Sequence, residues 1–354
     1  MMRSFFIALL FVFTLNIAPA RNTNVKHITS DVISISPDRK QLQTLGWPND
    51  IINSVAINTG KGIILIDTQN SPANARLIKS EIIDQFNDST FVYIINTHGH
   101  SCHTGGNSVF DQQSIVAHSL SIDEIKNYDD IFLGQTIDFL RKKIYYNNNV
   151  LDTMRTENAL SDSINESIDL YRFYEDDLLN NYKVRYPDLT FDDTLTINHG
   201  NKTIKMMYMG KGHGNADIMA YIEQDKVLCT GNLFHLGAQQ VDAMPSFYLN
   251  RVNEIEKWID TMSSFLKHYA GDFTILTTHG KKTFNRENLE FINEYCQLVS
   301  NEVKAAKKAG TSFEKLLEYE SFDNFFKKNR NVIGSSSKIA EMHERNLRII
   351  WKYL

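Results

Sequence analysis

The sequence has no concentration of basic residues, and this absence limits the partners that the protein can bind. Its 354 residues include 37 Lys and Arg against 42 Asp and Glu, which gives a net charge of −5. The pI is near 6.1, and no basic run is longer than three residues. Because phosphate backbones are bound by concentrated Lys and Arg surfaces, we expect no nucleic-acid partner.

Cysteine is also scarce, with three residues in the whole chain. An odd and small number does not indicate a disulfide framework. Cys296 lies in an apolar pattern with helical spacing, and Cys229 ends the apolar run "KVLC", so we expect both in the core. Cys102 alone lies among residues that commonly bind metals.

Only one apolar run in the chain is long, and it stands at the N-terminus. Arg3 precedes the apolar residues 5–15, and Ala18-Pro19-Ala20 forms a small-x-small cleavage site. This pattern predicts a secretory signal peptide over residues 1–20, with an uncleaved anchor as the alternative. We therefore expect an exported protein, periplasmic or extracellular, with no stable membrane anchor after cleavage. These features leave the oligomeric state open.

Internal repeats and low-complexity linkers are absent as well, which argues against a modular array. Residues 53–68 predict two strands around a Gly-Lys-Gly turn, 71–86 a helix capped by Ser71, and 91–96 a buried strand. Further strand patterns occupy 189–232 and 273–280. This order predicts a layered α/β domain over residues 21–284.

Two segments depart from this pattern. Residues 119–183 are polar, aromatic and helical in spacing, which predicts a helical insertion, and 285–354 predict a C-terminal helical extension packed on the domain. The aromatic side chains of the insertion either face a ligand as a lid or pack the insertion against the core, and we expect the packing. These are Tyr145, Tyr146, Tyr171, Phe173 and Tyr174.

Histidines gather in "THGHSCHTGGN", residues 97–107, directly after the buried strand. His98 and His100 stand two apart in an extended segment and point the same way, so they can bind one ion. His103 follows where the chain turns into a helix, which directs it to a neighbouring position. His213, in "MGKGHGNAD", and His279, in "ILTTHG", also follow predicted strand ends. We expect the other six histidines to be ordinary packing or surface residues.

Together with "GIILIDT", the motifs "THGHSCHTGGN", "GKGHGNAD", "KVLCTGNLF" and "LTTHG" resemble the metallo-β-lactamase superfamily over roughly residues 50–285. The resemblance implies an α/β fold, a four-layer αββα sandwich, with the metal site at one edge. It implies that His98, His100 and His213 hold a first zinc ion. The second zinc position is implied to use residue 102, His103 and His279.

The resemblance also gives roles to two carboxylates and reveals two departures. Asp67 is implied to steady the ligand loop, and Asp217 to order the loop of His213. The family usually has Asp where this chain has Cys102, and a bridging Asp where it has Asn232. Because two neighbouring divalent ions need anions beside them, we predict one firmly bound zinc and a second that is weakly held or vacant.

The leading functional hypothesis is an exported zinc-dependent hydrolase in which metal-bound hydroxide attacks an amide or ester, β-lactam-like or a lactone. Cys102, standing where the family's water-orienting acid stands, and His213 are the candidate catalytic residues. The alternative is a metal-binding protein of this fold with little or no catalytic activity. A nuclease is disfavoured by the signal peptide and acidic balance, and a di-iron redox protein by the histidine pattern.

Overall fold

A computed structural model describes residues 23–38, 51–154, 159–233, 244–245, 247, 254–280, 282–333 and 338–354. The predicted signal peptide lies outside these residues. Within them, no helix combines the length and the apolar character that crossing a membrane requires.

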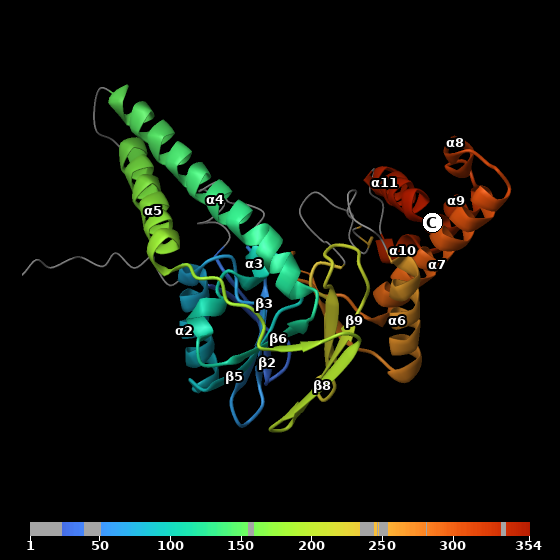
Figure 1. Ribbon diagram of the computed structural model, residues 1–354, viewed down its shortest axis with the longest axis horizontal. Coiled ribbons are helices and arrows are strands. Elements are labelled where there is room, and N and C mark those ends of the chain that lie inside the picture. Colours follow the sequence, from blue (N-terminus) through green and yellow to red (C-terminus); the bar gives the residue numbers. More distant parts are fainter. Residues whose placement is uncertain are drawn as a thin grey trace, which may run out of the picture.

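Two β-sheets form the centre of the molecule (Figure 1). The first has the order β1-β2-β3-β4-β5-β6-β7 and is antiparallel from β1 to β4 and parallel from β4 to β7. Its strands are β1 (Thr23–His27), β2 (Val32–Pro37), β3 (Ser54–Asn58), β4 (Ile63–Ile66), β5 (Phe91–Ile95), β6 (Ser114–His118) and β7 (Leu189–Phe191).

The second sheet has the order β12-β11-β10-β9-β8, with β11 and β12 parallel and the other pairs antiparallel. Its strands are β8 (Thr194–His199), β9 (Lys202–Tyr208), β10 (Ile218–Ile222), β11 (Val227–Cys229) and β12 (Thr274–Leu276). Strands β9, β11 and β12 therefore run in the same direction, and their carboxyl ends lie at one edge.

Side-chain alternation along the strands separates two hydrophobic layers. In β4, Ile64 and Ile66 point to the second sheet, while Ile63 and Leu65 point to the outer face of the first. All four side chains are buried, as expected for a strand covered on both faces.

Helices cover both outer faces and complete four layers (Figure 1). Helix α2 (Pro72–Phe86) packs on the first sheet through residues such as Ile78. Its N-terminus is capped by Ser71, whose hydroxyl accepts a bond from the Asn74 amide. Helices α6 (Ile255–His268) and α7 (Arg286–Lys308) pack on the second sheet. The predicted αββα sandwich is confirmed.

The predicted insertion consists of two long helices, α4 (Ser121–Asp152) and α5 (Ala159–Asn181), that project from the sandwich as a hairpin (Figure 1). Tyr171 and Tyr174 are buried, and Phe173 packs against the same cluster, so these three rings anchor the insertion. Tyr145 and Tyr146 are 71% and 64% exposed. The expected packing is therefore correct for the first three rings only, since the other two face solvent.

The C-terminal segment is helical, as predicted, and contains α8 (Phe313–Leu316), α9 (Glu320–Lys328), α10 (Arg330–Ile333) and α11 (Lys338–Tyr353) beyond α7. Its apolar side chains share one core cluster with the outer face of the second sheet. Cys296 is buried in that cluster, and Cys229 is buried between the sheets, as expected. The proposed domain limits at residues 21–284 and 285–354 stay a prediction.

Candidate metal centre

The carboxyl ends of strands from both sheets meet at one edge of the sandwich, where the predicted ligands lie. The loop after β5 and the short helix α3 (Ser101–Thr104) carry the "HGHSCH" residues, followed by the turn η1 (Asn107–Phe110). His213 follows β9, Asn232 follows β11, and His279 follows β12. The amide of Ile218, at the start of β10, donates to the Thr97 carbonyl (3.0 Å) and joins the two sheets here.

His98, His100 and His213 form the tightest group. One ring nitrogen of each lies within 4.8 Å of those of the other two. His98 and His213 are buried, and His100 is partly buried. The ring centroids are 4.5 Å apart for His98 and His100 and 5.0 Å apart for His100 and His213. Three converging imidazoles match the donor set of a zinc site with an open position.

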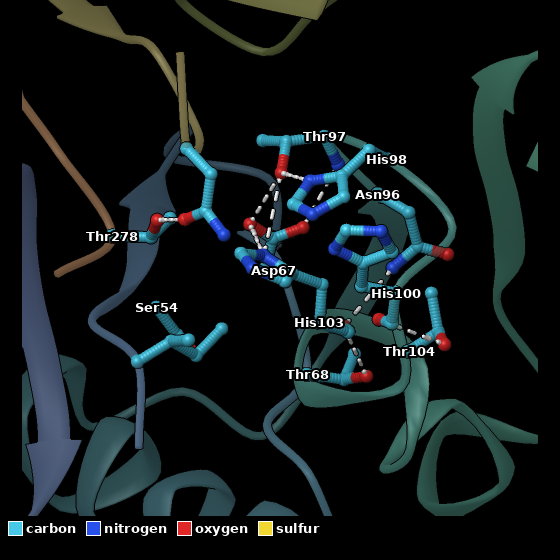
Figure 2. Close-up of polar contacts among 12 residues, drawn as sticks. Ser54, Asp67, Thr68, Asn96, Thr97, His98, His100, His103, Thr104 and Thr278 are labelled. Carbon is cyan, nitrogen blue, oxygen red and sulfur yellow. Dashed lines mark hydrogen bonds and ion pairs between the residues drawn. The ribbon is translucent and has the colours of Figure 1, made fainter. Parts of the chain in front are cut away.

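Asp67 organises the start of the histidine loop (Figure 2). Its carboxylate accepts bonds from the Thr97 amide and hydroxyl, both at 2.8 Å, and lies 2.8 Å from Nδ1 of His103. The Asp67 backbone has φ 60°, a left-handed conformation that is uncommon for non-glycine residues. Asp67 therefore connects the carboxyl end of β4 to two points of the loop after β5.

His103 has the surroundings of a metal ligand. The ring is fully buried; Nδ1 meets Asp67, and Nε2 has no hydrogen-bond partner among the described residues. A carboxylate behind one nitrogen fixes the tautomer so that the other can bind a cation. Burial lowers the pKa of His103, but the nearby Cys102 and Asp67 outweigh this effect and raise the pKa to about 10.

The partners predicted for His103 are less closely assembled. Cys102 is half-buried and near enough to raise the pKa of His103, while the His279 ring centroid lies 6.3 Å from that of His103. Among the described His, Cys, Asp and Glu residues, only His98, His100 and His213 bring three ligand atoms within 4.8 Å. The predicted second position is thus looser than the first.

Asn232 contacts the first group directly. Its Nδ2 lies 3.1 Å from Nε2 of His213, and its Oδ1 accepts a bond from the Thr278 hydroxyl. Because a hydroxyl hydrogen points at the amide oxygen, the amide nitrogen faces the histidine and can donate to its lone pair. The neutral Asn232 amide therefore occupies the position at which the family resemblance implies a negatively charged acid.

The loop of His213 is closed by Asp217. The amide of Gly214 donates to the Asp217 carboxylate (2.7 Å), and the Met209 amide donates to the Asp217 carbonyl (2.9 Å). Asp217 is buried. Its side chain and backbone thus hold both ends of the turn that carries His213.

The surroundings of His118 agree with the prediction that it is an ordinary packing residue. Its ring stacks on Tyr208 with centroids 3.8 Å apart, and Nε2 meets the Asp192 carbonyl at 3.0 Å. Burial lowers its pKa. His235 lies outside the described residues.

Sequence reasoning missed Glu124, a buried residue in the first turn of α4. Its carboxylate accepts bonds from the amides of Gly99 and Asn215, and Oε1 lies 3.8 Å from Nε2 of His100. The Tyr128 ring, one turn further on, lies 5.0 Å from that of His100. The only sequence signal was an acid near a helix start, which commonly reflects the helix dipole alone.

Comparison with known proteins agrees with the motif-based resemblance. The family model described as "Metallo-beta-lactamase superfamily" matches residues 47–243, more than half of the chain. Metallo-beta-lactamase type 2 of Bacillus sp. (strain 170) is 21% identical over 231 residues, which are 65% of this chain. The alignment spans 66% of that relative, just under two thirds of its length.

Solved structures show the same fold. A metallo-beta-lactamase from Pontibacter korlensis matches with a TM-score of 0.50 and 15% identity, over 78% of this chain and 99% of that one. TMB-1 matches with a TM-score of 0.51 and 15% identity, over 79% of this chain and 99% of its own. Because the family model matches residues 47–243, which include the motifs of His98 and His213, the chain belongs to the metallo-beta-lactamase superfamily.

Proposed function

We propose that this protein is an exported zinc-dependent hydrolase that cleaves amide or ester bonds in small molecules. The observation that carries the proposal is the convergence of His98, His100 and His213 at the edge of the sandwich. The printed name of the Bacillus relative, metallo-beta-lactamase type 2, supports β-lactam-like rings as the first substrate class to test, with lactones as the second.

The residues present fit a zinc ion at the first position. One ring nitrogen of each of the three imidazoles lies within 4.8 Å of the other two, which is the donor set of a three-histidine zinc site. A bound zinc ion supplies a Lewis acid that polarises a substrate carbonyl and makes water nucleophilic near neutral pH.

We assign the remaining roles to residues of this chain. His98, His100 and His213 hold the cation, while Asp67 fixes the histidine loop through Thr97 and His103. We assign Cys102 and His279 to a second, weaker position beside His103. Cys102 as a thiolate accepts hydrogen bonds weakly, so it is a poorer proton acceptor for an attacking water than the carboxylate usual in the family.

The contact between Asn232 and His213 favours one alternative, a metal-binding protein with little turnover. An amide that donates to Nε2 of His213 competes with a cation for the same lone pair. The alternative therefore predicts metal binding without hydrolysis.

Metal analysis of the protein from the exported fraction is the first test. We expect one to two zinc ions per chain and an N-terminus at or close to residue 21. A protein without zinc after mild purification, which also binds none on addition, would remove the basis of the proposal.

A hydrolysis screen with chromogenic β-lactam, lactone, thioester and phosphodiester substrates separates the two functions. His100→Ala should abolish turnover, whereas His268→Ala, which changes an exposed histidine on α6, should not. Turnover that persists in His100→Ala would come from a contaminant. Zinc binding without turnover on any substrate would favour the non-catalytic alternative.

A further inference from the structure

The helical insertion contributes a carboxylate to the edge of the sandwich. Glu124 lies in the first turn of α4 with only 1% of its surface exposed. It belongs to a segment outside the two sheets, and it lies far along the chain from His213. A buried carboxylate needs hydrogen bonds or a nearby cation to compensate for lost hydration.

Glu124 finds these bonds on two ligand loops at once. Oε2 accepts from the amide of Gly99 at 2.8 Å, and Oε1 accepts from the amide of Asn215 at 2.9 Å. Gly99 separates His98 from His100, and Asn215 stands two residues after His213. One carboxylate therefore joins the loop that carries His98 and His100 to the loop that carries His213.

The glycines of both loops leave the space that Glu124 fills. A Cβ atom at residue 99 would lie 2.7 Å from Cβ of Glu124, and one at residue 214 would lie 2.7 Å from its Oε1. Real Cβ atoms do not approach other atoms so closely. Neither glycine has a positive φ, so crowding favours the small residue, by Glu124 and the Ser121 carbonyl at residue 99 and by Glu124 and Asp217 at residue 214.

Glu124 also lies behind one of the histidines. Its Oε1 is 3.8 Å from Nε2 of His100. Glu124 does not belong to the group of ligand atoms within 4.8 Å of one another. Its position is that of a carboxylate behind a ligand histidine, which sets ring orientation and strengthens the ligand.

We propose that Glu124 is a positioning residue of the first metal site, through which the insertion holds both histidine loops in the geometry that binds the cation. The inference rests on the proposed function, since it presumes that the three histidines bind a metal. It makes the first turn of α4 part of the site.

Competition with a chromogenic chelator, using Zn²⁺ and Co²⁺ alone as probes, tests this proposal. Glu124→Gln keeps the shape but replaces one acceptor by a donor facing a backbone amide. We expect its metal affinity to fall roughly 10- to 100-fold and the visible absorption of bound Co²⁺ to shift as His100 reorients. Asp123→Asn is the matched control, because it removes the same charge from the same helical turn at a side chain that is 77% exposed.

The outcomes separate a positioning role from a structural one. Both variants are measured where circular dichroism shows them folded, and Glu124→Asp, which keeps the charge on a shorter stem, should fall between Glu124→Gln and the parent. If folded Glu124→Gln binds both metals like the parent and with the same Co²⁺ spectrum, the proposal is wrong even if its melting temperature drops. A parent protein that binds neither metal would instead overturn the proposed function and this inference together.

Discussion

The proposed first metal position draws its three histidines from two loops that are joined by hydrogen bonds, whereas the proposed second position draws on residues that are held separately. His98, His100 and His213 converge within 4.8 Å, and Asp67, Asp217 and Glu124 hold the loops that carry them. His103 is firmly held by Asp67, but His279 lies on the loop after β12, 6.3 Å away between ring centroids.

The two proposed positions differ in how firmly their ligand loops are held and in how much negative charge lies beside them. The carboxylates around the first position accept hydrogen bonds from the backbone and fix loop geometry. Where the family resemblance implies a bridging acid, this chain has Asn232, a neutral amide that faces His213. Two divalent ions about 3.5–4 Å apart need anions between or beside them, and Cys102 as a thiolate is the one the histidine motif offers.

The largest effect should follow loss of a ligand from the first position. His100→Ala is expected to weaken zinc binding by roughly 100-fold or more, beyond the 10- to 100-fold typical of groups behind the ligands. Chelator competition measures this effect, with His268→Ala as the control. Unchanged zinc affinity in His100→Ala would mean that the two positions have been assigned the wrong way round.

Two buried histidines differ in the direction of their pKa shifts. The pKa of His103, beside Asp67, is raised, whereas that of His343, in the C-terminal helices, is lowered. Burial lowers the pKa of His343 to about 4, slightly opposed by Asp323, and its Nδ1 lies 3.0 Å from the Tyr295 hydroxyl. The unfolded chain therefore takes up the proton first. The stability contribution is complete above about pH 6.5 and is lost as the pH falls toward 4, by about 3 kcal/mol.

Urea unfolding between pH 7 and pH 4 measures this loss. His343→Gln keeps an acceptor for Tyr295 and cannot titrate in this range, so its stability should depend less on pH. An identical pH profile in the parent and the variant would show that His343 has the same pKa in the folded and unfolded chains, and would contradict this prediction.

Restoring the anion at the bridge should strengthen the second position. Asn232→Asp removes the donor that faces His213 and adds a negative charge, so we expect a second zinc ion to bind roughly 10-fold more tightly. Equilibrium dialysis with metal analysis gives the stoichiometry. Asn180→Asp, at an exposed site on α5, adds the same charge elsewhere, and an equal gain in both variants would point to net charge alone.

The smallest effect concerns the cysteines. Cys102 is half-buried, whereas Cys229 and Cys296 are buried and burial raises the pKa of both thiols. Iodoacetamide should therefore label Cys102 first, and saturating zinc should slow that labelling roughly several-fold if the thiolate binds the ion. Peptide mass spectrometry reads out each site, and labelling of Cys102 that is indifferent to zinc would exclude it as a ligand.

Much of the fold could be predicted because its signals are local. Ser71 and Pro72 mark the start of α2, the alternation in residues 53–68 marks β3 and β4, and the helical spacing of 119–183 marks the insertion. The packing of Tyr171 and Tyr174 followed from the insertion's need to bury apolar surface. Tyr145 and Tyr146 have the same composition signal, yet the hairpin carries them away from the sandwich.

The sequence by itself determined the donor types, because imidazoles placed directly after strands can converge only at the strand ends. The sequence also places Cys102 and Asn232 at the two positions where the family resemblance implies acids. Only the tertiary structure decided which donors lie together, that the Asn232 amide faces His213, and that Glu124 joins the two loops. The physical reason is that these contacts form between residues distant in sequence, where a side chain's direction depends on how both sheets and the insertion pack.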